Sequence, residues 1–302
     1  MGIIQRFKQT IHCWENKNMR KGQKIMIKKL GIGIISWNRP NYLKQLLNSL
    51  EKNDLSDCNF HLLQDGFRCK FTNNIVADPK DISQSIKLFN DSKLPNKEFH
   101  IQEKNVSVAI NQFEAMQILC KNYRYFIFLE NDVIVSPNFI VVMKNLLKQF
   151  EHDKRVSCIS PNFRLFCKKK EIKQNIDRLT FFRGHFWAEA CWTKKWKIIE
   201  KEYMPYYNLV KNQPYEKRDE MVIKDLFNNS GMKMLTTSQD QGKDWAIMKS
   251  GMKRIRLVVN RATGIGDKGI HSTPGKLKAT RDGHNKIYTF EEELKIKEFK
   301  IR

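Results

Sequence analysis

The stretch Tyr125–Asp132, YFIFLEND, determines how the rest of this 302-residue sequence is interpreted. Its run of apolar and aromatic residues predicts a buried central strand, and the turn-forming segment 136–138 follows soon after. Ligands of open α/β sheets bind at the carboxyl ends of such strands. Glu130 and Asp132 would place two carboxylates there, and a hard cation takes such oxygen ligands. Asp132 is therefore the first candidate metal ligand, and the simpler alternative is that both acids only cap the strand.

Length and cysteine usage limit the class of protein. A chain of 302 residues can bury a sizeable core as one large domain or two closely packed halves. The 7 cysteines are scattered without a C-x-x-C pair, which favours a reducing cytosol over a disulfide framework or a zinc site. No stretch approaches the ~20 apolar residues that span a bilayer. The first residues also lack the apolar core of a signal peptide, so we expect a cytoplasmic protein.

The charge balance favours an anionic partner. The chain has 55 Lys and Arg against 32 Asp and Glu, a net charge of +23, which suits nucleic acid, acidic lipid or a phosphorylated substrate. Residues 1–29 form a basic leader with apolar residues at helical spacing. That pattern predicts an amphipathic helix lying on the inner face of an anionic membrane, while a helix packed on its own domain or a loosely ordered arm is an equal alternative.

The first strand and helix form a βα unit. Residues 30–35 are a short apolar run, typical of a buried parallel strand, and a polar loop with Arg39 and Pro40 follows. Pro40 keeps Arg39 out of a helix, and residues 42–50 then show one apolar face. We therefore expect Arg39 to lie where this strand ends.

A second strand repeats the pattern. Residues 59–64 are mostly apolar and stop at Asp65-Gly66, whose simple reading is a turn. Because the carboxyl ends of parallel strands share one edge of the sheet, Asp65 is expected near Arg39 and Asp132. Further elements follow from periodicity: helices near 82–89, 109–120, 139–150 and 216–228, an edge strand at 99–102, and strands at 156–161 and 252–260.

The second half of the sequence has a different character. A lysine-rich insertion at 164–178 precedes the aromatic segment 181–192, which is either core or the floor of a sugar-stacking pocket. Asp240 and Asp244 share one face if their segment is helical. A glycine-rich loop then ends at His271, which is either a metal ligand or an ordinary histidine outside the site. From 276 onward the composition predicts a solvated tail.

These motifs in this order resemble GT-A glycosyltransferases, close to the bacterial family-2-like and nucleotide-diphospho-sugar transferases. The matching blocks are the opening strand and N-R-P turn at 32–40, Q-D-G at 64–66, the D-x-D-like L-E-N-D at 129–132, the tryptophan-rich segment 186–192, the acidic region 238–245 and the loop 260–273. Two departures stand out. Asn131 replaces the middle acid of the metal motif, and Glu189 after Ala188 breaks the usual glycine-tryptophan pair.

The resemblance implies an α/β GT-A fold, Rossmann-like, with a mostly parallel central sheet flanked by helices and a C-terminal acceptor-side half. It divides the single domain into a leader at 1–29, a nucleotide-sugar-binding half at 30–161, an acceptor and catalytic half at 162–275, and a basic tail at 276–302. The implied activity is transfer of a hexosyl or N-acetylhexosaminyl group from a nucleotide sugar to a glycan or lipid-linked acceptor, with inversion, in polysaccharide biosynthesis.

The resemblance also assigns roles to residues. Asp132 and His271 would hold Mn²⁺ or Mg²⁺, and Asp244, with Asp240 as second choice, would deprotonate the acceptor. The expected nucleotide-sugar contacts are Ser36, Asn38, Arg39, Asp65, Glu130 and Asn131. The expected acceptor-side residues are Trp187, Glu189, Trp192 and Trp245.

Two other classes of function remain open from the sequence. The net charge and the aromatic content suit a nucleic-acid-binding protein, although the basic residues are spread over leader, insertion and tail. Asn131 and the basic leader suit a catalytically inactive, membrane-associated scaffold with the same fold. A nucleic-acid partner is the less favoured of these expectations.

Overall fold

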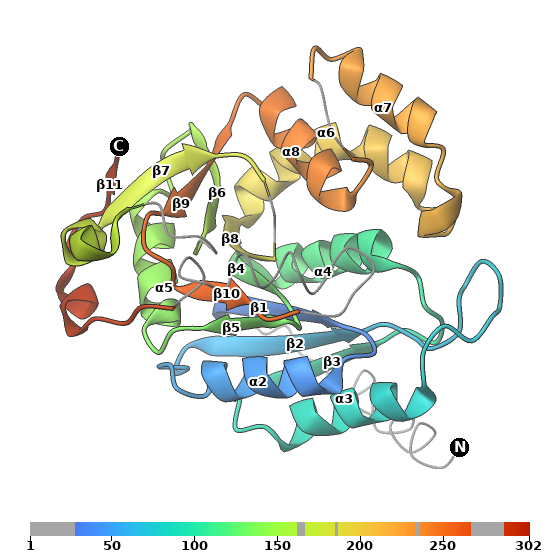
Figure 1. Cartoon of the computed structure of the whole chain (residues 1–302), viewed down its shortest axis with the longest axis horizontal. Helices are drawn as coiled ribbons and strands as arrows, with labels where there is room; N and C mark the ends of the chain where they lie inside the picture. Colours follow the sequence, from blue (N-terminus) through green and yellow to red (C-terminus); the bar gives the residue numbers. More distant parts are fainter. Residues whose placement is uncertain (1–27, 162–166, 185–186, 233–235, 267–286) are drawn as a thin grey trace, which may run out of the picture.

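The computed structural model describes residues 28–161, 167–184, 187–232, 236–266 and 287–302. Within them a large mixed sheet has the strand order β11-β7-β9-β6-β8-β4-β1-β2-β3, with helices on both faces (Figure 1). Its strands are β1 Lys28–Ser36, β2 Cys58–Gln64, β3 Lys97–Ile101, β4 Tyr123–Glu130, β6 Val156–Ser160, β7 Arg178–Phe182, β8 Ala188–Trp192, β9 Lys253–Leu257 and β11 Lys300–Ile301. A second sheet pairs β5 Val133–Val135 with β10 Ala262–Gly264.

The helices connect and cover these strands. They are α2 Pro40–Leu50, α3 Pro79–Asp91, α4 Val108–Asn122, α5 Phe139–Gln149, α6 Thr193–Val210, α7 Glu220–Asn228 and α8 Gln239–Lys249. Short 3₁₀ turns are η1 Lys169–Glu171, η2 Lys173–Asn175, η3 Tyr215–Lys217 and η4 Glu291–Lys295. None of the helices in the described ranges combines the length and the apolar character that crossing a bilayer requires.

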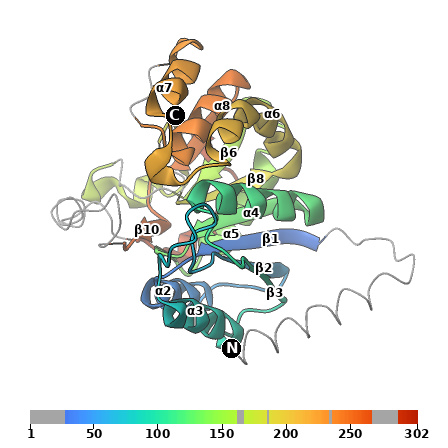
Figure 2. The same cartoon turned by 90° about the vertical axis from the view of Figure 1, so that its right-hand side faces the viewer.

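The parallel part of the sheet reverses its direction of growth between β1 and β4. β1 pairs in parallel with β2 on one side and β4 on the other, and β2 pairs in parallel with β3. The chain therefore moves outward from β1 to β3 and then returns to the other side of β1. Helices α2 and α3 lie on one face and α4 on the opposite face (Figure 1, Figure 2). Ligands of such sheets bind in the crevice outside the strand ends at this reversal.

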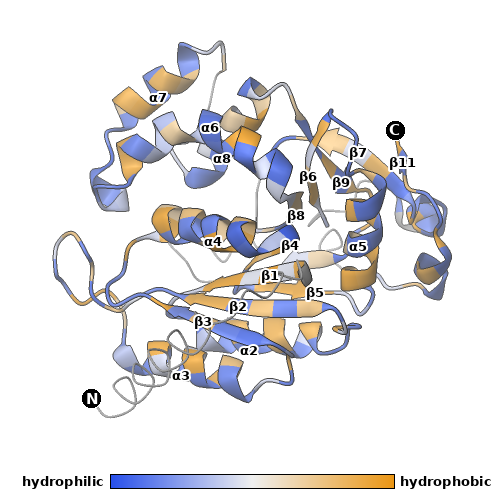
Figure 3. Cartoon of the chain, turned by 180° about the vertical axis from the view of Figure 1, so that it is seen from behind, coloured by the Kyte–Doolittle hydropathy of each residue, from blue (hydrophilic) through white to orange (hydrophobic). Residues whose placement is uncertain are grey.

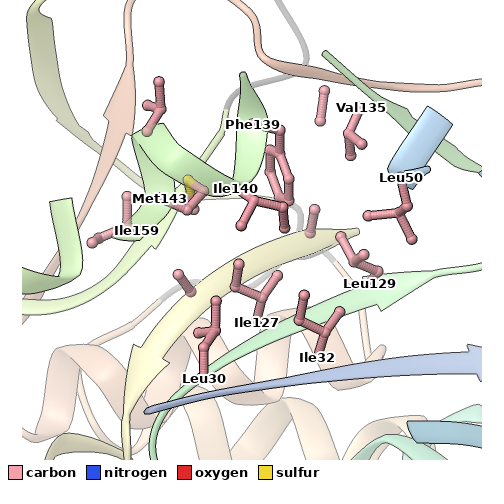
Figure 4. Close-up of a cluster of buried hydrophobic side chains, with 14 of the residues drawn as sticks. Leu30, Ile32, Leu50, Ile127, Leu129, Val135, Phe139, Ile140, Met143 and Ile159 are labelled. Carbon is pink, nitrogen blue, oxygen red and sulfur yellow. The ribbon is translucent and has the colours of Figure 1, made fainter. Parts of the chain in front are cut away.

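Alternation along the strands produces a core on each face. Ile32 of β1 and Ile127 and Leu129 of β4 pack with Phe139 of α5 and its neighbours, as Figure 4 shows. Phe128, which points the other way, packs against the side chains of α4, α6 and α8. The predicted α/β fold with a mostly parallel, doubly covered sheet is confirmed. The segment with Asp240 and Asp244 is helical, which was the condition for the two acids to share one face.

The aromatic segment of the second half forms strands of the same sheet. β8 lies between β4 and β6 and pairs antiparallel with both, and β7 pairs antiparallel with β9. All five residues of β8 are buried, so this part of the aromatic segment is core, as one of the two readings of the sequence expected. The sheet therefore runs without a break from the expected nucleotide-sugar-binding half into the expected acceptor-side half.

The prediction of a solvated tail is wrong for residues 287–302. β11 adds a parallel strand beside β7, and Phe299 is buried. The side chain of Gln149 accepts a hydrogen bond from the Phe299 N–H and donates one to its carbonyl oxygen. Glu293 places its carboxylate Oε1 2.7 Å from Nε of Arg261, and both side chains are completely buried. Nothing in the sequence indicated this packing, because many residues of the segment are charged and remain exposed while only a few, such as Phe299 and Glu293, are buried.

Two other expectations lie partly or wholly outside the described residues. Of the basic leader expected at 1–29, residues 1–27 lie outside the described part of the chain, and its last two residues belong to β1, which begins at Lys28. His271 falls within 267–286, which is also outside the described part of the chain.

We predict that the Arg261–Glu293 pair fastens the C-terminal segment. Glu293→Gln leaves the Arg261 guanidinium buried without its counter-charge and should lower the free energy of unfolding by about 3–5 kcal/mol, measured by urea denaturation. Glu292→Gln is the matched control because Glu292 is exposed and lies 3.6 Å from Lys173; it should leave stability nearly unchanged. Equal stability of Glu293→Gln and the control would contradict this assignment.

Candidate active site

Polar groups from two strands meet at the point where the sheet reverses direction. Ile35 of β1 pairs with Glu130 of β4, so the residues after each strand leave the sheet side by side. Nδ2 of Asn131 lies 3.5 Å from Oγ of Ser36, and Arg39, just before α2, places Nη1 2.8 Å from Oδ2 of Asp132. The sequence prediction that Arg39 and Asp132 lie near each other is thus confirmed.

The Arg39–Asp132 ion pair is open to solvent on one side. The Arg39 side chain is 32% exposed and that of Asp132 is 18% exposed. Asn131 is buried beside this pair, and its Oδ1 lies 3.5 Å from Nη2 of Arg39. Asn131 therefore positions the arginine, and an amide suits that role because it accepts one hydrogen bond and donates another.

Asp132 also contacts a segment more than 130 residues later in the chain, directly after β10. β5 begins directly after it and pairs with β10, and the Ile265 N–H donates to the Asp132 carbonyl oxygen at 2.7 Å. Gly266 passes so close that a Cβ atom there would lie 2.4 Å from Oδ2 of Asp132. A side chain at position 266 would therefore require the Asp132 carboxylate to move. The loop then continues into residues 267–286, which contain His271 and lie outside the described residues.

Negative charge accumulates behind this pair. The pKa of Glu130 is raised well above its ordinary value by burial and by the nearby carboxylates of Asp132 and Asp240, while Arg39 and Lys243 oppose the shift. The Glu130 N–H donates to the Trp187 carbonyl oxygen, which joins the end of β4 to the start of β8. Three carboxylates in so small a region suit a cation that prefers oxygen ligands.

Helix α8 supplies the second pair of acids. Ser238 caps its first turn by accepting a hydrogen bond from the Gln241 N–H. Asp244, one turn after Asp240, is buried, and its carboxylate accepts from the Gly184 N–H at 2.8 Å and from Nη2 of Arg254 at 3.0 Å. Burial raises the pKa of Asp244, and Arg254 opposes that rise. Asp244 therefore connects α8 to the loop after β7.

A buried ion pair lies under the acids. Lys243 of α8 is paired with Glu189 of β8, and both side chains are almost fully buried. Burial lowers the pKa of Lys243 to about 7, and the nearby Asp244 and Glu130 oppose that effect. The sequence analysis placed Glu189 on the acceptor side and did not select Lys243. The position of Lys243 between Asp240 and Asp244 was the one sequence feature that could have indicated it. Its pairing with Glu189 depends on the position of β8 in the sheet.

The Asp65 carboxylate accepts hydrogen bonds from the loops at the ends of β2 and β3. Oδ1 accepts from the Gly66 and Val106 N–H groups at 3.0 and 2.8 Å, and Oδ2 accepts from Nδ2 of Asn105 at 2.8 Å. These bonds hold the segment that leads to Ser107, whose φ of 76° is unusual for a residue with a side chain. Burial raises the pKa of Asp65 from 3.8 to about 7, against the effect of these hydrogen bonds. Asp65 thus shapes the loop beside the strand ends.

Two of the expected acceptor-side tryptophans are core residues. Trp192 pairs with Tyr125 at the opposite end of β4 from Glu130, and its Nε1 donates to the Leu147 carbonyl oxygen. Trp245 is fully buried and packs against Phe227 of α7. The structure does not bring either ring to the acid cluster, by which we mean Glu130, Asp132 and Asp240. Their aromatic character serves packing, which is the commoner use of such side chains.

The other expected residues do lie around the site. Trp187 is half-buried, and a Cβ atom added at Gly264 would meet its ring at 3.6 Å, so this ring lies beside β10. Asn38 is half-buried in the loop between β1 and α2. Ser36 is buried, and its carbonyl oxygen accepts from the Asp65 N–H, which ties the ends of β1 and β2 together.

Comparison by sequence identifies no related protein. No protein-family profile matches the chain. No curated protein matches it either.

Comparison by structure finds GT-A glycosyltransferases. The mannosyltransferase PcManGT from Pyrobaculum calidifontis, solved with GDP-Man and Mn²⁺, is 9% identical, with a TM-score of 0.38 over 64% of this chain and 53% of that one. TarS 1–349 from S. aureus is 12% identical, with a TM-score of 0.45 over 79% of this chain and 61% of that one. The galactosyltransferase LgtC, solved with donor and acceptor sugar analogues, is 13% identical, with a TM-score of 0.39 over 74% and 70%.

This chain therefore spans 53% and 61% of the length of the first two solved chains. At such identities the activity has to be inferred from the side chains of this protein.

The raised pKa of Asp65 predicts a pH-dependent stability. The folded protein binds a proton at Asp65 more tightly than the unfolded chain does, so the free energy of unfolding should fall as the pH rises from about 4 to about 7, by up to about 1.4 kcal/mol per pH unit. Asp65→Asn should remove this contribution to the slope, whereas Asp57→Asn, at an exposed aspartate, should keep it. Denaturation at several pH values measures the slopes, and identical slopes in all three proteins would refute the prediction.

Proposed function

We propose that this protein is a glycosyltransferase that moves a hexosyl or N-acetylhexosaminyl group from a nucleotide sugar to a glycan or lipid-linked acceptor. The observation that supports it is the meeting of Arg39, Asp132 and Glu130 with Asp240 of α8 where the sheet reverses between β1 and β4. A reversal point is where open α/β sheets bind nucleotides. The acids and the arginine match the chemistry of a charged diphosphate.

The donor diphosphate is proposed to bind over the Arg39–Asp132 pair. Asp132 and Glu130 present oxygen atoms, which suit Mn²⁺ or Mg²⁺, and the lack of a side chain at Gly266 lets the Asp132 carboxylate keep its position. When bound, the cation would neutralise the charge that develops on the departing diphosphate. His271 is proposed as a further ligand on the same loop as Gly266; an imidazole ligand favours Mn²⁺ over Mg²⁺. Arg39 is exposed enough to contact a phosphate directly.

Asp240 is proposed as the general base, ahead of Asp244. Asp240 contributes together with Asp132 to the raised pKa of Glu130, which supports a position toward the proposed donor site. Asp244 is buried, and its carboxylate accepts from Gly184 and Arg254 on the side of the loop after β7. The acceptor hydroxyl would give its proton to Asp240 while its oxygen forms a bond to the anomeric carbon. The bond from that carbon to the diphosphate breaks, and this single displacement inverts the configuration. Asp244 would act as a positioning residue for the loop after β7.

The acceptor is proposed to enter beside Trp187. This ring lies next to β10, and its own carbonyl oxygen is bonded to Glu130, so it flanks the place where the sugar would sit. Aromatic rings stack well on the apolar face of a sugar. A lipid-linked acceptor would also suit peripheral attachment of this basic chain to the inner face of an anionic membrane, with roles in polysaccharide biosynthesis.

A panel of nucleotide sugars tests the donor site. Wild-type protein with Mn²⁺ should bind one donor and hydrolyse it slowly, and both effects should disappear in Asp132→Asn and on adding a chelator. Gly266→Ala should lose donor binding as well, because its Cβ atom displaces the Asp132 carboxylate. Gly264→Ala is the matched control, since its Cβ atom makes only an ordinary contact with Trp187.

The outcomes separate the possible readings. Full activity in chelator would remove the metal from the proposal. Donor binding that survives in Asp132→Asn and Gly266→Ala would place the donor elsewhere. No binding of any donor would count against the transferase proposal itself.

Paired substitutions on α8 test the choice of base. Asp240→Asn should lower kcat by about 10²–10⁴-fold with donor binding retained, because the acceptor proton loses its carrier. Asp244→Asn should instead mainly lower the melting temperature, because it leaves the buried Arg254 without its counter-charge. A large loss of kcat in a stable Asp244→Asn, with Asp240→Asn active, would reverse the assignment.

A further inference from the structure

A second group of metal-binding side chains lies at the outer edge of the sheet. His61 is in the middle of β2, and Glu98 and His100 are on the edge strand β3. One ligand atom from each lies within 4.8 Å of the others. We propose that these three residues bind a divalent transition-metal ion of zinc-like chemistry. This site is separate from the acid cluster and does not depend on the proposed transferase activity.

The strand register creates the cluster. His61 is the direct partner of Glu98, and His100 follows two residues later, so all three side chains leave the same face of the two strands. His61 is also the partner of Gly33 in β1, well before the strand ends at which Ser36 and Asp65 lie. A metal here would connect β3 to β2 through side chains, in addition to their backbone hydrogen bonds.

The distances fit a tetrahedral ion. Nδ1 of His61 lies 3.0 Å from Nε2 of His100 and 3.6 Å from Oε2 of Glu98. With metal–ligand bonds of about 2.0–2.1 Å, neighbouring ligands of a tetrahedral zinc ion are roughly 3.3 Å apart. These two distances lie on either side of this value, and the third pair, Glu98 and His100, has its ligand atoms within 4.8 Å.

The surroundings of His61 favour the form that binds metal. Its other ring nitrogen, Nε2, lies 2.6 Å from the hydroxyl oxygen of Tyr123, which also accepts a hydrogen bond from Nδ2 of Asn59 at 3.1 Å. A phenol oxygen can accept two hydrogen bonds, so Nε2–H can donate to it as well. This leaves the lone pair of Nδ1 directed at Glu98 and His100. Histidine ligands of metals typically donate their second N–H in this way.

The depth of the site explains both its stability and its access. His61 is completely buried, and Asn59 of the same strand is buried as well. Figure 3 shows that β2 alternates between hydrophilic and hydrophobic residues along its length. Glu98 is 34% exposed on the edge strand, so an ion can enter from solvent and keep a water as its fourth ligand. Two imidazoles and one carboxylate select zinc-like ions over Mg²⁺ or Ca²⁺.

Metal titration of the full chain tests this site. After removal of metal with a chelator, the wild-type protein should bind Co²⁺ with a tetrahedral visible spectrum, and Zn²⁺ should displace it. His100→Gln and Glu98→Gln should each weaken this binding at least tenfold. Tyr123→Phe keeps the ring and should weaken it about 10–100-fold, because it removes the hydroxyl that pairs with His61 and also accepts from Asn59.

Controls separate this site from others in the chain. His152→Gln makes the same change at an exposed histidine and should leave the tetrahedral signal unchanged. Asp132→Asn should also keep it, which distinguishes the edge site from the proposed donor site. Zn²⁺ should raise the melting temperature of the wild type more than that of His100→Gln. Absence of the signal in the wild type, or equal affinity in the wild type and in both ligand variants, would show that His61 and His100 are only a hydrogen-bonded pair.

Discussion

Carboxylates that are held together in a partly buried place need nearby positive charge, and this requirement organises the described part of the chain. Glu130, Asp132 and Asp240 come from two distant segments; burial raises the pKa of Glu130, and the two nearby aspartates raise it further. Arg39 at the start of α2 and Lys243 of α8 supply the opposing charge from either side. Removing one partner from such a group costs far more than the pair contributes, because a buried charge is left alone.

Each of these charges is supported by a second layer of contacts. Lys243 is paired with Glu189 of β8, and Asn131 contacts Arg39 and Ser36. β8 can reach this position because it enters the sheet antiparallel between β4 and β6. The site is thus built on strands of the central sheet and one helix, which would suit the precise placement that the proposed group transfer requires.

The two metal-binding regions inferred here differ in chemistry and in place. The reversal point offers carboxylate oxygens at strand ends that face solvent, which suits a cation exchanged together with a phosphorylated ligand. The edge site offers imidazole nitrogens in the middle of buried strands, which suits an ion that stays with the fold. Strand β2 links the two regions, since His61 and Asp65 are both on or directly after it.

Short-range patterns were enough to predict the α/β class, most of the strands and helices, and the proximity of Arg39 and Asp132. Apolar runs predict strands, spacing predicts helices, and the carboxyl ends of parallel strands must share an edge. The partner of each buried charged group, by contrast, depends on how distant elements pack. Lys243 meets Glu189, Asp244 meets Arg254, and Glu293 meets Arg261 across large separations in the chain.

The same reason explains what the sequence concealed. Trp192 and Trp245 are core residues, residues 287–302 dock on the sheet, and His61 meets His100. Each depends on the register or packing of elements distant in sequence, and a single sequence contains no local signal for register between such elements. Local residue patterns therefore predicted the strand ends, whereas the pairing of strands decided what stands beside them.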